Sequence, residues 1–158
     1  MAPPFDGADR KYAADIQATL SAEDIASSYA RIAMPVKKDT PLCNFVVPYG
    51  TKGAPMIGST DVGDVSWVVP TVQARCATVA IGTPGHSWQI TAQGKSPHAK
   101  KGMVNAAKVM AGLAVDALNE PSLIASAKAD LRARTEATPY VSPMPADVKP
   151  PIQPRPAS

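Results

Sequence analysis

The two histidines are the residues of this chain whose chemistry is easiest to specify, and both fall in one region. His86 lies in the stretch Ala80-Ile-Gly-Thr-Pro-Gly-His-Ser-Trp-Gln-Ile90, after a run of small and β-prone residues. A histidine that follows a buried strand and a glycine-proline turn can present a neutral imidazole nitrogen to a metal ion. Gly85 and Ser87 leave His86 room to project from such a strand end. His86 is therefore a candidate metal ligand, and an exposed loop histidine fits the same residues equally well.

His98 follows Ser96-Pro97, a pair that predicts a helix start because serine is a favoured N-cap and proline suits the first helical position. In the first turn of a helix, the positive end of the helix dipole disfavours a protonated imidazole. A neutral His98 could bind a metal, but an ordinary surface position on the helix explains it without one. His98 is therefore the weaker candidate.

The segment Gly58, Ser59, Thr60 and Asp61 forms a compact polar turn. If this turn opens a helix, its backbone N–H groups would suit a carboxylate. Asp61 and Asp64 could act as acid–base groups or metal ligands, although acids in a first helical turn usually serve the helix dipole. A Ser-His-Asp triad built from Ser59 or Ser87 lacks a nucleophile elbow, so we set it aside.

Composition excludes several classes of function. The net charge of +3 is small and dispersed, which argues against a nucleic-acid partner. We expect no membrane partner because no apolar run approaches the length of a membrane span. No signal peptide is predicted, and the two cysteines lack metal-binding spacing and fit free buried thiols. These features together predict a cytoplasmic protein.

Hydrophobic periodicity and capping residues predict helices and a few strands. Helices are expected over residues 8–20 after Asp6, from Ser21 to before Pro35, over a short stretch between Ser59 or Thr60 and Pro70, over 97–118 and over 122–135. Residues 71–81 predict a strand, and residues 87–92 fit a short strand or an extended loop. The fold class predicted is α/β, with few strands flanked by helices. Apolar residues of the long helix, from Met103 to Ala117, are expected to pack on the sheet.

Two regions are expected along the chain. Residues 1–137 would form part of a catalytic domain, and residues 138–158 would form an extended, proline-rich tail. A polyproline ligand for a partner domain is the alternative interpretation of the tail. Aromatic residues make up only 5% of the chain, so we expect a thin core that belongs to a larger domain.

Three blocks of sequence resemble the zinc-dependent aminoacylase/carboxypeptidase superfamily of amidohydrolases, in particular its aminobenzoyl-glutamate-cleaving members. The blocks are Ile57-Gly-Ser-Thr-Asp-Val-Gly-Asp-Val-Ser-Trp-Val-Val-Pro70, Gly82-Thr-Pro-Gly-His-Ser-Trp-Gln89 and His98-Ala-Lys-Lys-Gly-Met-Val-Asn-Ala-Ala-Lys108. Thr138-Pro-Tyr-Val-Ser-Pro143 also looks like this family. The resemblance covers essentially the whole chain and implies the carboxyl-terminal part of a metallopeptidase-like catalytic domain.

The resemblance implies a two-metal enzyme that hydrolyses an amide next to a free carboxylate, with a glutamate as general base. His86 matches the last metal ligand of the family, and Gly58, Ser59, Thr60 and Asp61 match a turn beside the substrate. The family's early histidine–aspartate and paired-glutamate motifs are absent from this sequence, so no catalytic residue is assigned.

The function expected is therefore that of one portion of a metal-dependent amidohydrolase. Its substrates would be N-acyl or aminobenzoyl-glutamate amides or dipeptide-like molecules. The full-length enzyme would use Zn or Mn, bind a small-molecule amide and form a homo-oligomer. The chain alone is expected to be inactive. The alternative is a truncated, catalytically inactive fragment that acts only as a binding or assembly module.

Overall fold

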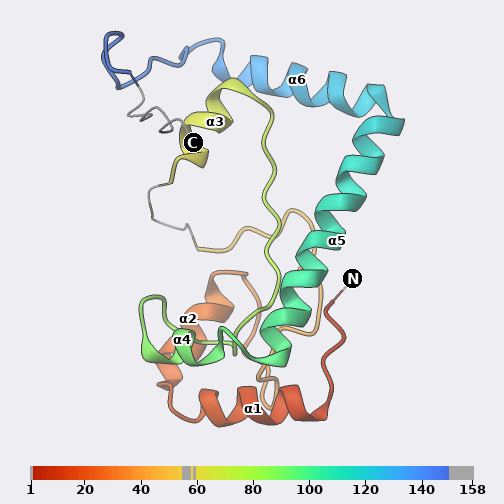
Figure 1. The fold of residues 1–158 in the computed structure, drawn as a ribbon, viewed down its shortest axis with the longest axis vertical. Helices are drawn as coiled ribbons and strands as arrows, with labels where there is room; N and C mark the ends of the chain where they lie inside the picture. The colour runs from red at the N-terminus through yellow and green to blue at the C-terminus, as the bar shows by residue number, and fades with distance from the viewer. Residues whose placement is uncertain (1, 55–57, 59, 150–158) are drawn as a thin grey trace, which may run out of the picture. The chain divides into compact units, whose positions relative to one another are not determined.

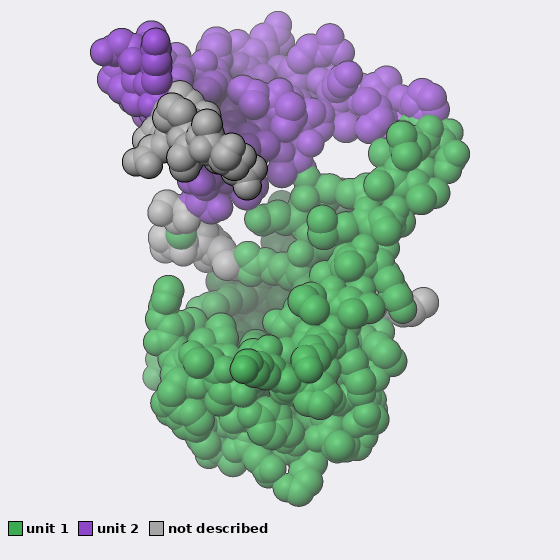
Figure 2. Space-filling view, viewed as in Figure 1, with its two compact units in different colours: residues 1–58, 72–120 green, residues 59–71, 121–158 purple. Residues whose placement is uncertain are grey.

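The computed structural model describes residues 2–54, 58 and 60–149, and each regular element among them is an α-helix. The helices are α1 (Gly7–Gln17), α2 (Ala22–Ala30), α3 (Val62–Val68), α4 (Trp88–Gln93), α5 (Pro97–Asn119) and α6 (Pro121–Thr135) (Figure 1). None of the described helices is long and apolar enough to cross a membrane. The chain divides into two units: residues 1–58 with 72–120, and residues 59–71 with 121–158 (Figure 2). Of the predicted tail, residues 138–149 are described, and the remainder lies outside the described residues.

Capping residues set the starts of α1, α2 and α5 as predicted. Asp6 and Ser21 each form a capping box, with Asp9 and Asp24 respectively. Ser96 accepts a hydrogen bond from the Ala99 N–H at the start of α5, and Pro97 occupies the first helical position. These local bonds satisfy N–H groups that have no partner within the helix, which is why the starts could be read from the sequence.

The predicted α/β fold is wrong, because the described residues contain no strand. Residues 72–78 carry no regular structure in the position of the predicted strand. A strand needs a second chain segment to complete its backbone hydrogen bonds. Here the Ile81 N–H bonds instead to the Pro41 carbonyl, and the Ala80 N–H bonds to the side chain of Gln93. Residues 87–92, expected to form a short strand or an extended loop, fall largely on helix α4, which Ser87 caps.

The core of the first unit is small. Phe5, Ala13 and Ile16 pack with Leu42 and Ala80, so α1 lies against two irregular segments. The apolar residues of α5 do not pack on a sheet as predicted. Met103, Met110 and Leu113 are 62%, 67% and 44% exposed, so much of that helix face is open.

Ionic contacts join the start of α1 to α5. The Lys101 Nζ atom lies 2.6 Å from Asp6 Oδ2 and 2.5 Å from Asp9 Oδ2. The hydrogen bond from Lys101 lowers the pKa of Asp6 to about 2, with a further contribution from the Asp9 N–H. Asp9 is buried, so Lys101 supplies the positive charge that a buried carboxylate requires. The two ion pairs of Lys101, with Asp6 and with Asp9, therefore fix the register of α1 against the first turns of α5.

Helix α5 also approaches the irregular segment closely at Gly102. A Cβ atom there would lie 2.0 Å from the Ala77 carbonyl oxygen, a distance that the backbone must move to relieve. At Gly112 of the same helix, a Cβ atom would meet nothing within 4 Å. Only glycine therefore allows the contact between α5 and residues 77–78.

The two glycines predict opposite effects of alanine. Gly102→Ala should destabilise the chain by about 1–3 kcal/mol or more, because the added methyl overpacks the contact with Ala77. Gly112→Ala should stabilise it by up to about 1 kcal/mol, because alanine is the better helix former. Urea denaturation of both variants measures the difference. Equal midpoints for the two would contradict the close approach at Gly102.

Candidate functional site

His86 lies in an exposed turn between residues 80–84 and helix α4. Its φ angle is +58°, in the left-handed region that non-glycine residues seldom adopt. The next residue, Ser87, caps α4: its Oγ accepts from the Ile90 N–H at 3.3 Å and donates to the Pro84 carbonyl at 2.8 Å. The expected strand end is therefore a turn before a helix, but it still presents the imidazole to solvent. No described residue forms a hydrogen bond with that ring.

His98 is fully buried, which contradicts the surface position expected for it. Its Nε2 atom lies 3.3 Å from the Oε1 atom of Gln93, and its ring centroid lies 5.7 Å from that of Tyr12. Its Nδ1 atom is buried without a hydrogen-bond partner in the described structure. Burial lowers the pKa of His98, opposed by the charge of Asp9. The imidazole is therefore kept neutral, as expected, but by burial rather than by the helix dipole alone.

Gly58 belongs to the first unit, with the two histidines, whereas Thr60 and Asp61 belong to the second unit. Ser59 lies outside the described residues, and Gly58 is exposed at the end of its segment of the first unit. Thr60 and Asp61 are exposed at the start of α3. Asp61 is the N-cap residue of α3, but its side chain makes no capping bond.

The N–H groups expected to form an anion site are partly used within the turn itself. The Val62 N–H bonds to Thr60 Oγ1 at 3.4 Å, and the Gly63 N–H bonds to the Thr60 carbonyl at 2.9 Å. Asp64 also has a partner, since its Oδ1 accepts from the Tyr140 hydroxyl at 3.0 Å. That bond raises the pKa of the Tyr140 hydroxyl and joins α3 to the Thr138–Pro143 block. The Asp64 carboxylate therefore has a structural role, as the hydrogen-bond acceptor of Tyr140.

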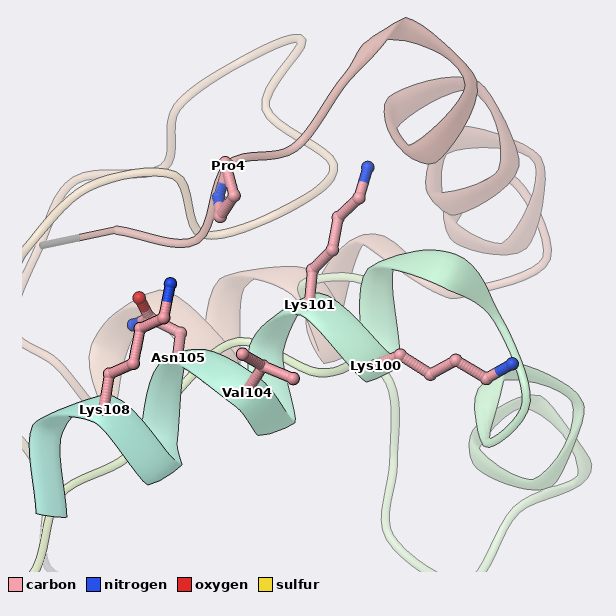
Figure 3. Close-up of a pocket in the computed structure, with 6 residues that line it drawn as sticks. All are labelled: Pro4, Lys100, Lys101, Val104, Asn105 and Lys108. Atoms are coloured by element: carbon pink, nitrogen blue, oxygen red, sulfur yellow. The ribbon is translucent and has the colours of Figure 1, made fainter. Parts of the chain in front are cut away.

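Two cavities of the first unit are lined by residues other than the histidines. One of about 230 Å³ is lined by Pro4, Lys100, Lys101, Val104, Asn105 and Lys108. In Figure 3, Lys101 extends toward α1, where Asp6 and Asp9 hold it, while Lys100 points away from Lys108, so the three ammonium groups do not converge. A second, of about 250 Å³, is lined by both free cysteines, Cys43 and Cys76, together with residues 75–83. The lining of these two cavities contains no histidine.

The described residues contain no group of three or more histidine, cysteine or acidic side chains placed to hold a metal ion. His86 fits one ligand position, because its ring is exposed and unengaged among the described residues. His98 fits poorly, because one ring nitrogen faces Gln93 and the other is buried.

The sequence did not reveal that a buried glutamine joins residues 80–83 to helix α4 by hydrogen bonds. Gln93 has no exposed surface, and its carboxamide contacts Ala80, Thr83 and Gln89. A single glutamine in a segment of mixed polarity carries no signal of such a role. The Ser87 N-cap before Trp88 was the local sign that α4 is a helix.

Comparison with known proteins shows a relative that matches most of this chain. The chain is 35% identical, over 94% of its own length, to a subunit of p-aminobenzoyl-glutamate hydrolase from Escherichia coli. That match confirms the resemblance inferred from the sequence blocks. The chain spans 33% of the length of that relative. No family model and no solved structure matches the chain.

The geometry at His98 predicts its protonation. Nitrogen-15 NMR of the ring should show a neutral imidazole protonated at Nε2, with a titration midpoint below 6.5, because burial disfavours the cation. Since the unfolded state takes up this proton at about pH 6.5, the free energy of unfolding should fall as the pH drops below that value. Replacing His98 with glutamine should remove this part of the pH dependence of the free energy of unfolding. A midpoint at or above 6.5 would contradict the buried position.

Proposed function

We propose that this chain is part of a metal-dependent amidohydrolase that cleaves aminobenzoyl-glutamate or related N-acyl amino acid amides. The similarity to the Escherichia coli p-aminobenzoyl-glutamate hydrolase carries the proposal, because it extends over 94% of the chain. The exposed, unengaged imidazole of His86 agrees with it, since a metal ligand must keep a ring nitrogen accessible.

In this proposal His86 supplies one ligand to a divalent metal, Zn or Mn. When bound, such a metal polarises the amide carbonyl and lowers the pKa of its bound water. The remaining ligands and the general base belong to parts of the enzyme that this third of the length does not cover. Gly58, Ser59, Thr60 and Asp61 are assigned to the side of the substrate that bears the carboxylate. The exposure of Thr60 and Asp61 leaves them accessible for that role.

A second candidate function is a binding or assembly module without catalysis. The exposed apolar side chains of α5 favour it, since monomeric proteins seldom leave large contiguous apolar surfaces in water. The exposed large apolar residues of this helix are Met103, Val104, Val109, Met110, Leu113, Val115 and Leu118. The occupant proposed in this case is a second copy of the chain, in keeping with the homo-oligomer expected from the sequence.

The test of the hydrolase proposal is a chimera in which this chain replaces the matching third of the Escherichia coli relative. The chimera should hydrolyse p-aminobenzoyl-glutamate, whereas the chain alone, with added zinc or manganese, should not. His86→Ala in the chimera should reduce kcat/KM by about 100-fold or more and lower the bound metal. The reason is that removing a metal ligand lowers activity and metal affinity more than removing a residue that only hydrogen-bonds to a ligand. His98→Ala should keep the metal and lose stability. Loss of metal in His98→Ala but not in His86→Ala would reverse the assignment.

The assembly module predicts self-association through α5. Light scattering should report dimers or larger species of the purified chain, because burial of the α5 face removes apolar area from water. The double variant Met110→Lys, Leu113→Lys should shift the chain toward monomer. Met144→Lys serves as the control, because Met144 is 65% exposed, close to the 67% of Met110, but lies outside α5. A wild-type chain that remains monomeric at high concentration would exclude this module.

A further inference from the structure

Residues 80–93 form a loop whose two ends are joined by one side chain. The carboxamide of Gln93, at the end of α4, accepts a hydrogen bond from the Ala80 N–H at 2.7 Å through Oε1. Its Nε2 donates to Thr83 Oγ1 at 3.1 Å and to the Gln89 carbonyl at 3.0 Å. Thr83 Oγ1 in turn donates to the Ala80 carbonyl at 2.7 Å. Gln93 thus bonds to the first residue of the loop, to Thr83 three residues later and to Gln89 within α4.

The orientation of this carboxamide is fixed by its partners. The Ala80 N–H can only donate, so it must face Oε1, and the Gln89 carbonyl can only accept, so it must face Nε2. The His98 Nε2 atom lies beside Oε1 and must therefore carry its proton toward that oxygen. Gln93 and His98 are both fully buried, so the bonds of the carboxamide with Ala80 and His98 are shielded from water, while those with Thr83 and Gln89 are partly buried. The closed loop thus has one consistent hydrogen-bonding arrangement.

Contacts outside the loop anchor it on α1. The Gln17 side chain donates to the Ile81 carbonyl at 3.0 Å, and the Tyr12 hydroxyl donates to the Ala92 carbonyl at 3.0 Å. These two bonds hold both ends of the loop to one helix, but neither spans its interior. Between these ends, Gln89 Nε2 donates to Thr19 Oγ1 at 3.4 Å, and the internal bonds of Gln93 and Ser87 hold the part of the loop around His86.

We propose that Gln93 is a positioning residue for His86, holding the loop so that the imidazole keeps one direction toward solvent. The proposal rests on the assignment of His86 as a metal ligand. His86 adopts a left-handed backbone conformation, which a non-glycine residue keeps only where the surrounding structure enforces it. The bonds from Gln93 to Thr83 and Gln89 lie on either side of His86 in sequence and provide that enforcement. A metal ligand with a fixed direction loses less conformational entropy on binding.

The first test uses the full chain without metal. Gln93→Met keeps the side-chain length but removes the hydrogen bonds that close the loop. It should speed hydrogen exchange of the Ala80 amide by about tenfold or more, and lower the heteronuclear NOE of residues 85–87 toward that of a mobile loop. Gln73→Met is the matched control, because Gln73 is exposed and outside the loop, and it should behave as wild type. Unchanged exchange and NOE values in a folded Gln93→Met would overturn the proposal.

Two further variants keep the test decisive. Should Gln93→Met fail to fold, Thr83→Val removes the hydrogen bonds of Thr83 Oγ1 with Gln93 and with the Ala80 carbonyl but keeps the bond from Ala80 to Gln93. It should give a smaller loss of order at residues 85–87; no loss would overturn the proposal. Lys101→Met breaks the ion pairs with Asp6 and Asp9 but none of the loop's hydrogen bonds. It should lower the melting temperature while leaving the order of residues 85–87 intact. Equal loss of loop order in Lys101→Met would show a general stability effect and overturn the specific role of Gln93.

Titration with zinc chloride of the chimera, in which the Escherichia coli relative would supply the remaining ligands, is followed by the His86 ring resonances and separates this proposal from the proposed function. The wild-type His86 resonances should shift on zinc addition, and Gln93→Met should weaken the apparent affinity by about 10-fold or more, as for other residues that support a ligand. Absence of any zinc response at His86 in wild type would contradict its role as a ligand, while the exchange measurement still decides the loop. A zinc response that is equally strong in Gln93→Met would overturn the positioning role and leave the ligand assignment standing.

Discussion

The first unit depends on satisfying the polar backbone of an irregular segment that packs among helices without strand neighbours. Burying an unpaired N–H or carbonyl is costly, so residues 80–83 need partners. Side chains and a loop provide them: Gln93 serves Ala80, Gln17 serves Ile81, and Pro41 accepts from the Ile81 N–H. The positions of α1 and α4 follow from this requirement, since each must bring a glutamine to the segment.

The contact between α5 and this segment imposes a second condition. Gly102 lets the helix backbone reach the Ala77 carbonyl, and Lys101, one residue earlier, faces the carboxylates of Asp6 and Asp9. Adjacent residues of one turn thereby hold the irregular segment on one side and α1 on the other. The start of α5 organises the unit, whereas its second half carries exposed apolar residues.

The same arrangement separates the two histidines by role. His98, two residues after the Ser96 cap, is buried, and its Nε2 atom contacts the Gln93 carboxamide. His86, one residue before the Ser87 cap, is left in solvent at a strained turn. A buried neutral imidazole and an exposed one thus occupy one short region, and only the exposed ring suits binding a metal together with ligands from elsewhere in an enzyme.

The sequence alone determined the features that depend on near neighbours. The starts of α1, α2 and α5 followed from Asp6, Ser21 and Ser96, because a cap bonds within its own first turn. The resemblance carried by the Ile57–Pro70 and Gly82–Gln89 blocks was also readable, and a relative confirms it. Tertiary structure alone decided that residues 71–81 form no strand, that His98 is buried, and that Gln93 closes the loop around His86. These outcomes depend on partners brought together by folding: a strand requires a neighbour, and a buried side chain requires the helices that cover it.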